Sequence, residues 1–325
     1  MWMELFAIGG GFVLLTWSAD RFVSGASGIA FNLRVSPLII GLTIVSLGTS
    51  APEILVSVVA AMQGNAGLAI GNAIGSNIIN TGLILGITAV IVPLGVHSSI
   101  IRRELPVMLL VMVVAFLLLL DGTLGRIDAV IMLTGMAAIL YWVVHIARQA
   151  HTQGADPISG EFADEIPTDM PMGRSVFWLV VAGLVLIGSS RMLVWGAVSV
   201  AHSLGVSDLV IGLTIVALGT SLPELAASVA SAFKKQHDIA LGNIIGSNIF
   251  NILAVLGLPG LIDPGPVDAA VLTRDFPVML GLALLLFVMA YGWRGPGRIN
   301  RFEGAFLMTA FCGYQTLLYF SELAT

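Results

Sequence analysis

Ten runs of mainly apolar residues divide this chain, and they restrict its fold more than any other feature. A helix needs about 20 such residues to cross the hydrocarbon core of a bilayer. The runs lie at roughly 4–30, 36–61, 67–91, 104–120, 126–147, 175–201, 208–232, 238–262, 276–292 and 301–320. Only 10% of the residues are charged, whereas an ordinary soluble domain has about 25%. We therefore predict an all-α integral membrane protein with ten transmembrane helices. This composition excludes a soluble enzyme, a nucleic-acid-binding protein and a secreted disulfide scaffold.

An internal repeat divides these runs into two sets of five. Residues 41–86 align without a gap on residues 212–257, at an offset of 171, with 25 of 46 positions identical. The shared positions include polar strings such as Gly-Thr-Ser-x-Pro-Glu, which chance similarity between apolar segments would not preserve. We predict a first five-helix repeat over 1–147, a linker over 148–174 and a second repeat over 175–325.

The second repeat is expected to be inverted, because five spans return the chain to the membrane from the opposite side. Inverted repeats related by a pseudo-two-fold axis in the membrane plane are the architecture of many secondary transporters. Their substrate sites lie near the bilayer midplane, on interrupted helices at the repeat interface. Inversion gives one chain two similar conformations, each open to one side.

The placement of lysine and arginine orients the chain, because cytoplasmic loops carry an excess of both. With the N-terminus outside, 11 basic residues fall in inner loops and 3 in outer loops. The inner residues are Arg21, Arg34, Arg102, Arg103, Arg148, Arg174, Lys234, Lys235, Arg294, Arg298 and Arg301, and the outer ones are Arg126, Arg191 and Arg274. We expect the N-terminus outside and the linker in the cytoplasm.

Two glutamates, Glu53 and Glu224, lie deepest within apolar runs and occupy equivalent positions of the repeat. A charge at the bilayer centre costs roughly 2.5–3.5 kcal/mol on insertion scales, so two such costs indicate a paired role. Each glutamate follows a proline, which leaves the carbonyl of Gly48 or Gly219 without its helical partner. Beside Thr and Ser hydroxyls, these freed oxygens can be ligands for a hard cation. Two neutral glutamic acids bonded to helix backbones are the plainer alternative.

A second polar motif, Gly-Asn-x-Ile-Gly-Ser-Asn, follows in each repeat. Ser76 and Asn80 lie four residues apart on one helix face, as do Ser247 and Asn251, and we expect these faces to point toward the glutamates. The other asparagines of the motif are expected to join neighbouring helices. They are Asn72, Asn77, Asn243 and Asn248.

The candidate ligands are all oxygens. The five histidines fall at span ends or in loops, unclustered, and Cys312 is the single cysteine, so zinc and copper are not expected. Oxygen-only sites suit Na⁺, Mg²⁺ or Ca²⁺. Calcium accepts irregular oxygen shells, whereas magnesium gives up its water reluctantly, so a dry and flexible site favours calcium.

These motifs resemble those of the sodium/calcium exchanger family of the cation/calcium antiporter superfamily. The resemblance rests on GTSAPE with GNAIGSNIIN and on GTSLPE with GNIIGSNIFN, in matching order. It implies a ten-helix inverted-repeat fold around one calcium site and several sodium sites. It also implies that Glu53 and Glu224 bind calcium with the backbone oxygens of Thr49 and Thr220. The further sodium ligands that it implies are Ser50, Ser76, Ser221 and Ser247, with the carbonyls of Ser46 and Ala217 at the periphery.

One position departs from the family pattern. Residue 251 is Asn, where microbial and potassium-dependent relatives often have Asp. The neutral pair of Asn80 and Asn251 therefore resembles the potassium-independent exchangers. The short linker also differs from animal exchangers, which carry cytosolic calcium-regulatory domains.

We accordingly predict a Na⁺/Ca²⁺ antiporter of a prokaryotic plasma (inner) membrane that works by alternating access. The expected partners are the two transported ions and the lipid bilayer, with no cofactor and no nucleic acid, and the protein is expected to be a monomer and not an enzyme. Ca²⁺/H⁺ exchange is an alternative, because protons could titrate the same glutamates. A passive cation channel is a second alternative, of another class. An intramembrane hydrolase would need a base near Ser50, and no His or Lys stands there.

Overall fold

The computed structural model describes residues 2–33, 35, 37–64, 66–96, 101–152, 170–203, 217–291 and 297–323. The chain forms two compact units. Unit 1 consists of Met1–Leu55 and Ala138–Ser247, and unit 2 of Val56–Ala137 and Asn248–Thr325. Each unit therefore draws on both sequence repeats.

The elements that the structure describes in unit 1 are helices. They are α1 (Trp2–Leu33), α2 (Pro37–Ile40), the π-helical turn η1 (Gly41–Val45), α3 (Ser46–Thr49), the start of α4 (Ala51–Met62), the end of α8 (Arg126–Thr152), α9 (Met172–Ser203), α11 (Ala217–Thr220), α12 (Leu222–Phe233) and most of α13 (His237–Phe250).

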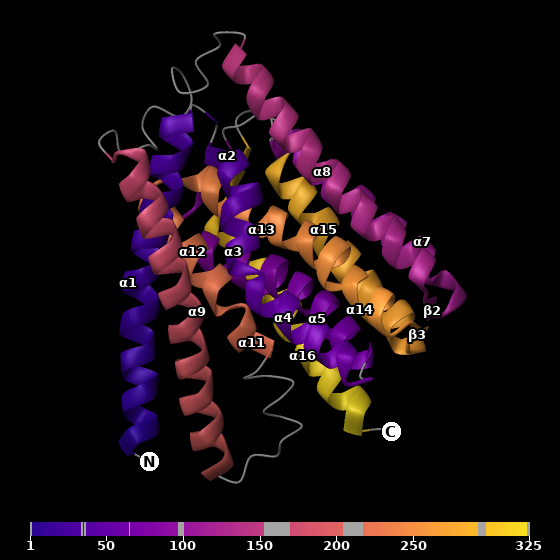
Figure 1. Ribbon diagram of the computed structural model, residues 1–325. Coiled ribbons are helices and arrows are strands. Elements are labelled where there is room, and N and C mark those ends of the chain that lie inside the picture. Colours follow the sequence, from indigo (N-terminus) through magenta and orange to yellow (C-terminus); the bar gives the residue numbers. More distant parts are fainter. Residues whose placement is uncertain are drawn as a thin grey trace. The chain divides into compact units, whose positions relative to one another are not determined.

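Within unit 1, α1 and α9 are the first helices of the two repeats, and they run side by side in opposite directions (Figure 1). A Cβ on Gly25 would lie 2.8 Å from the backbone oxygen of Ser175, and one on Gly196 would lie 2.8 Å from that of Glu4. Glycine at both places lets the helix backbones approach closely. Gly25 and Gly196 are separated by the repeat offset, as are Glu4 and Ser175. The same contact is thus made twice, as expected for antiparallel helices related by a two-fold axis.

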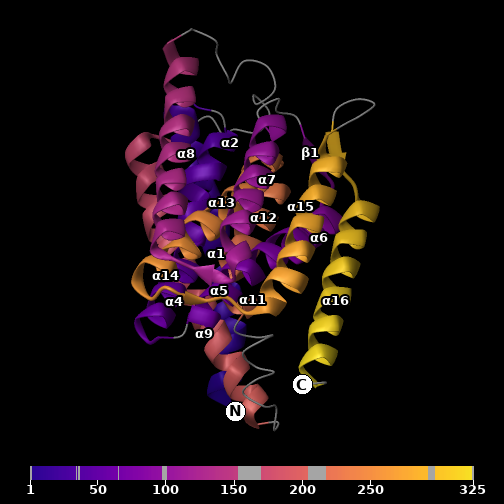
Figure 2. The same cartoon turned by 90° about the vertical axis from the view of Figure 1, so that its right-hand side faces the viewer.

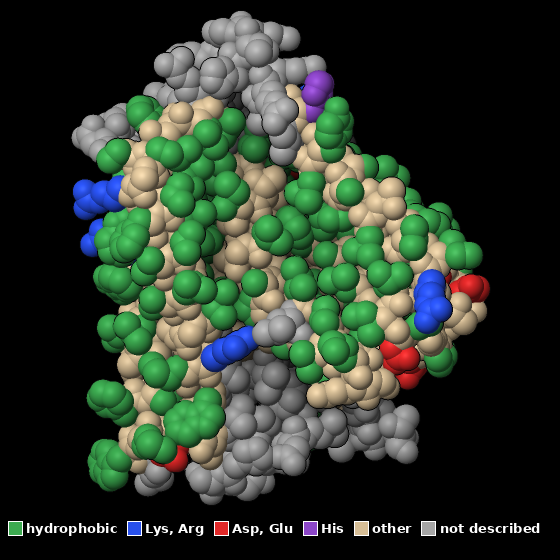
Figure 3. Space-filling model, viewed as in Figure 1, with side chains coloured by type: hydrophobic (Ala, Val, Ile, Leu, Met, Phe, Trp, Pro, Cys, Tyr) green, Lys and Arg blue, Asp and Glu red, His purple; other side chains and the backbone are tan. Residues whose placement is uncertain are grey.

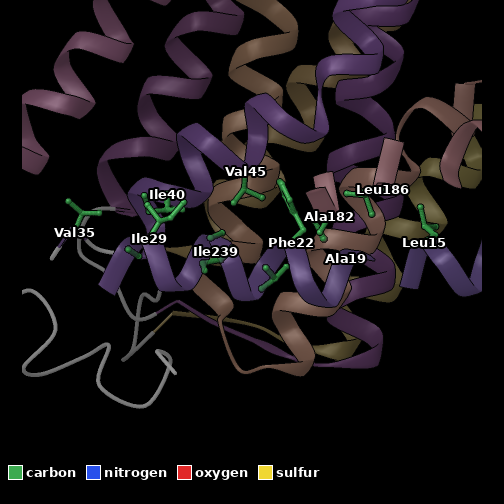
Figure 4. Close-up of a cluster of buried hydrophobic side chains, with 14 residues drawn as sticks. Leu15, Ala19, Phe22, Ile29, Val35, Ile40, Val45, Ala182, Leu186 and Ile239 are labelled. Atoms are coloured by element: carbon green, nitrogen blue, oxygen red, sulfur yellow. The ribbon is translucent and has the colours of Figure 1, made fainter. Parts of the chain in front are cut away.

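A cluster of buried apolar side chains fills the space beside this helix pair (Figure 4). Its members include Phe22 of α1, Ala182 and Leu186 of α9, Val45 of η1 and Ile239 of α13. Inside a bilayer such packing stabilises mainly through close van der Waals contact, because lipid tails are as apolar as the side chains. The cluster connects the long helix pair to the segments that carry the repeat motifs.

The described residues of unit 2 form the remaining helices and four short strands. Its helical elements are the rest of α4, α8 and α13, with α5 (Ala66–Ile78), the π-helical turn η2 (Ile79–Ile84), α6 (Leu85–Ile91), α7 (Ile101–Leu118), the 3₁₀ turn η3 (Leu119–Asp121), the π-helical turn η5 (Asn251–Val255), α14 (Gly257–Ile262), the π-helical turn η6 (Val271–Asp275), α15 (Phe276–Ala290) and α16 (Arg301–Leu323).

The strands of unit 2 form two antiparallel ladders, and each ladder joins one repeat to the other. β1 (Leu94–Val96) pairs with β4 (Gly297–Ile299), which connects α15 to α16 (Figure 2). β2 (Thr123–Leu124) pairs with β3 (Gly265–Pro266). These ladders satisfy backbone groups at the helix ends, which would otherwise need water or side-chain partners.

The helices agree with a multi-pass membrane protein. Among the described residues, seven helices are long and apolar enough to cross a membrane, and the bent pair of Gly41–Thr49 and Ala51–Met62 makes eight if it forms one span. On the face shown in Figure 3, hydrophobic side chains predominate over charged ones. The helix α16 covers the expected span 301–320 but is not one of these seven helices.

Two expectations fall partly outside the described residues. Residues 153–169 of the expected linker and residues 204–216, at the start of the expected span 208–232, are not among them. On either side of the first gap, α8 extends to Thr152 and α9 already begins at Met172, so both ends of the expected linker are helical.

Candidate ion-binding site

The segment that carries each glutamate is interrupted one turn before it. In the first repeat the helix axis bends by 53° between Gly41–Thr49 and Ala51–Met62. The interrupting residue is Ser50 (φ −82°, ψ 5°), and its repeat equivalent Ser221 has almost the same conformation (φ −89°, ψ 6°). A proline two residues later cannot donate to the carbonyl four residues before it, which explains a break at this position. The helix is thus interrupted beside the motif proline in both repeats.

The serine at each break donates a hydrogen bond to the glutamate of the other repeat. The Ser50 hydroxyl donates to Oε1 of Glu224 at 2.9 Å, and the Ser221 hydroxyl donates to Oε1 of Glu53 at 3.2 Å. All four side chains are at most 1% exposed. This reciprocal pairing brings both carboxyl groups into one buried cluster within unit 1.

Asn243 extends the cluster and was not among the predicted ligands. Its Oδ1 accepts a hydrogen bond from the Thr49 hydroxyl at 3.0 Å. Its Nδ2 donates to the Ser228 hydroxyl at 3.1 Å and to the Glu224 backbone oxygen at 3.4 Å. Asn243 therefore links Thr49 of the first repeat to Glu224 and Ser228, which lie one helical turn apart on α12.

The equivalent residue of the first repeat makes the matching contact in unit 2. Asn72 of α5 donates to the hydroxyl of Ser57 on α4 at 2.9 Å. The expectation that these asparagines join neighbouring helices is confirmed for Asn72 and Asn243. In each repeat, the glutamate-bearing helix is thus tied to the helix that follows it.

The remaining predicted residues of unit 1 are Ser46, Ser247, Ala217 and Thr220. Ser46 is buried and donates to the backbone oxygen of Leu42 at 2.8 Å, while its own carbonyl accepts from the Ser50 N–H at 2.9 Å. Ser247 is buried, and Ala217 and Thr220 begin and end the short helix α11.

Three predicted residues, Ser76, Asn80 and Asn251, belong to unit 2, where all three are buried. Asn80 lies in the π-helical turn η2, and Asn251 begins the π-helical turn η5. Such turns are rare and often mark functional positions, and here they occur at equivalent places in the two repeats. That these residues face the glutamates stays a prediction.

The cluster of unit 1 has the chemistry of a cation site. When ionised, two carboxylates carry two negative charges, which equal the charge of one Ca²⁺. Each serine donates its only hydroxyl hydrogen to a carboxylate, so the lone pairs of its oxygen stay available to face a cation. Among the described residues, Oε2 of Glu224 has no hydrogen-bond partner. A buried carboxylate oxygen in that condition is costly unless a cation or proton meets it.

Comparison with known proteins identifies the family. The family model described as sodium/calcium exchanger protein matches residues 3–145 and 174–320, most of the chain. This chain belongs to that family. The match falls in two segments, one in each half of the sequence.

Relatives that match over nearly their whole length support the same family. The chain is 50% identical to a putative antiporter, CaxA, of Alkalimonas amylolytica over 96% of this chain and 97% of that protein. It is 44% identical to the inner membrane protein YrbG of Escherichia coli, with 95% and 94% covered. A solved structure of the sodium-calcium exchanger NCX_Mj superposes with a TM-score of 0.81 at 32% identity, covering 95% of this chain and 96% of that one. The family and its exchangers are transporters, so this protein is a transporter and not an enzyme.

Proposed function

We propose that this protein is a secondary antiporter that exchanges Ca²⁺ for Na⁺ across a prokaryotic plasma membrane by alternating access. The reciprocal pairing of Ser50 with Glu224 and of Ser221 with Glu53 is the observation that supports it most strongly. A calcium ion needs anionic oxygens to offset its dehydration, and this cluster holds two buried carboxylates in one unit. The solved exchanger that this chain resembles is a sodium-calcium exchanger.

In this proposal the glutamates bind calcium together with the backbone oxygens of Thr49 and Thr220. Sodium uses these groups and a wider set of oxygens. The wider set is Ser46, Ser50, Ser76, Asn80, Ala217, Ser221, Ser247 and Asn251. Because unit 1 supplies both carboxylates, calcium and sodium compete for the same charge, which couples their movements.

The proposal includes ten transmembrane helices arranged as two inverted repeats, over 1–147 and 175–325, acting as a monomer. The antiparallel packing of α1 on α9 supports the inversion, because Gly25 and Gly196 make equivalent contacts in opposite directions. Single-cysteine labelling tests the orientation after Cys312 is replaced. Gln153→Cys should react only with reagent on the cytoplasmic side, and Gly122→Cys only with reagent outside. The reverse pattern would overturn the orientation.

Calcium flux in proteoliposomes tests the function. Purified protein is reconstituted, and calcium uptake is measured against imposed gradients of Na⁺, H⁺ or K⁺, one at a time. An outward Na⁺ gradient should drive uptake, and the other two should not. Uptake driven by the proton gradient alone would replace this proposal with Ca²⁺/H⁺ exchange.

A further inference from the structure

Two amide–thioether contacts lie inside unit 2, and none of the four residues that make them is a predicted ion ligand. Nδ2 of Asn77 lies 3.4 Å from Sδ of Met279, and Nδ2 of Asn248 lies 3.6 Å from Sδ of Met108. Both pairs differ by the repeat offset, so this is one contact made twice, each time between the two repeats. All four side chains are at most 1% exposed.

A thioether sulfur determines which way an amide points. Sulfur in methionine accepts hydrogen bonds weakly and has no hydrogen to donate, whereas an amide has a donor end and an acceptor end. The NH₂ group of Asn77 therefore faces Met279, and its oxygen faces the other way. That oxygen accepts a hydrogen bond from Nδ2 of Asn251 at 3.2 Å. The relay leaves Oδ1 of Asn251 buried, with no hydrogen-bond partner among the described residues.

We propose that Met279 is a positioning residue that, through Asn77, turns the Asn251 carboxamide so that its oxygen and not its NH₂ group is available to a transported cation. The reversed amide would present two hydrogens with partial positive charge, which repel a cation. This inference rests on the proposed exchange of sodium for calcium and adds two residues to its machinery, Met279 and Asn77.

The equivalent contact, between Asn248 and Met108, does not continue to Asn80, the repeat equivalent of Asn251. Asn248 donates to Met108 and also to the Thr81 hydroxyl at 2.9 Å. The residue equivalent to Thr81 is Ile252, which has no hydroxyl. Neither polar atom of Asn80 has a hydrogen-bond partner among the described residues. Only Asn251 is thus oriented by a relay within the described part of the chain, and Met108 provides a matched control.

The test compares Met279→Leu with Met108→Leu in sodium-driven calcium flux from proteoliposomes. Leucine is close to methionine in volume, so both variants keep the packing and lose the acceptor. Met279→Leu should raise the half-saturating Na⁺ concentration about threefold or more, the size of one lost neutral hydrogen bond, with little change in maximal rate. Met108→Leu should stay within about twofold, because Thr81 still orients Asn248. Equal shifts in the two variants would overturn the proposal.

Two further variants separate positioning from packing. In an Asn251→Asp background, Met279→Leu should have no additional effect, because a carboxylate offers oxygen at both ends. Met279→Gln keeps an acceptor and should transport with a nearly normal Na⁺ requirement. If Met279 only fills space, glutamine will be worse than leucine, and the leucine effect will persist in the Asn251→Asp background. A wild-type protein without sodium-driven calcium flux would overturn the proposed function itself, and this inference with it.

Discussion

The polar cluster of unit 1 is built on carboxylates, whereas that of unit 2 is built on amides and thioethers. Both follow one rule, in which a residue of one repeat bonds a residue of the other and the contact occurs twice. Ser50 with Glu224 is the pattern in unit 1, and Asn77 with Met279 is the pattern in unit 2. The repeat thus supplies charge in one place and neutral oxygens in another.

The two clusters also differ in symmetry. The serine–glutamate pairs are equivalent in both repeats, at 2.9 and 3.2 Å. The amide contacts are not equivalent in the two repeats. Asn77 accepts a hydrogen bond from Asn251, whereas Asn248 donates one to Thr81. One sequence difference, Thr81 against Ile252, explains why the Asn248–Thr81 hydrogen bond has no equivalent in the other repeat. The charged ligands should therefore respond alike to substitution, and the neutral ones unequally.

The largest effect is expected from the charge of unit 1. Glu53→Gln or Glu224→Gln should abolish calcium transport in proteoliposomes while the protein still inserts, because calcium loses half of its compensating charge. Glu104→Gln is the matched control, since Glu104 is also a buried acid (3% exposed) but lies on α7 of unit 2. Near-normal transport by either cluster variant would refute the assignment.

The serines should follow with an intermediate effect of equal size. Ser50→Ala and Ser221→Ala each remove a hydrogen bond to a carboxylate, a class worth about 1.5–3 kcal/mol. The calcium concentration at half-maximal flux should rise about tenfold in each variant. If one variant is affected and the other is normal, the reciprocal pairing is not the basis of calcium binding.

The neutral side chains of Asn80 and Asn251 predict no potassium requirement. Asn80 and Asn251 add no charge for a co-bound cation, so wild-type calcium flux should be the same when K⁺ is replaced by choline. Asn251→Asp puts a carboxylate among these amides and should introduce sensitivity to K⁺ or to pH. A wild-type flux that vanishes without K⁺ would show that neutral amides do not exclude potassium.

The smallest expected effect is on thermal stability. It concerns the turn between α4 and α5 and the equivalent turn between α12 and α13. Gly64 has φ 73°, and its equivalent Lys235 has φ 60°, where a side chain is strained. Lys235→Gly should raise the thermal stability slightly and Gly64→Ala should lower it, each by up to about 1–2 kcal/mol. Melting temperatures in detergent, compared with wild type, measure both. A lower melting temperature for Lys235→Gly would show that the two turns are not equivalent.

Much of the charged cluster could be predicted from the sequence, because repetition and burial cost are visible in residue types. Glu53 and Glu224 stand out as acids inside apolar runs, and the prolines beside them predict that each helix is disturbed one turn earlier, near Thr49 and Thr220. The structure places the breaks one residue later, at Ser50 and Ser221. The crossing of each serine to the glutamate of the other repeat could not be predicted, since it depends on how two distant segments meet.

The roles of the neutral residues are less visible in the sequence. The sequence indicates only a helix-joining role for Asn243, and its distances to Thr49 and Glu224 are what connect it to the site. Met279 resembles any other apolar residue of its span, because nothing in a sequence distinguishes a sulfur that accepts a hydrogen bond. Asn248 follows Asn77, and Met279 follows Met108, by the same repeat offset of 171 residues. This spacing points to a functional pair only once the contacts of Asn77 with Met279 and of Asn248 with Met108 are known.

We expect the exchange of calcium for sodium to be obligatory, and calcium efflux tests this most directly. An empty cluster with two uncompensated carboxylates is costly to occlude, so only a loaded carrier should change sides readily. Calcium-loaded proteoliposomes are diluted at alkaline pH into a medium without Na⁺, Ca²⁺ or other permeant cations, with the membrane potential clamped. Efflux should be near zero, rise when external Na⁺ is added, and rise less with external Ca²⁺. Rapid efflux into the cation-free medium would contradict the exchanger and indicate a channel.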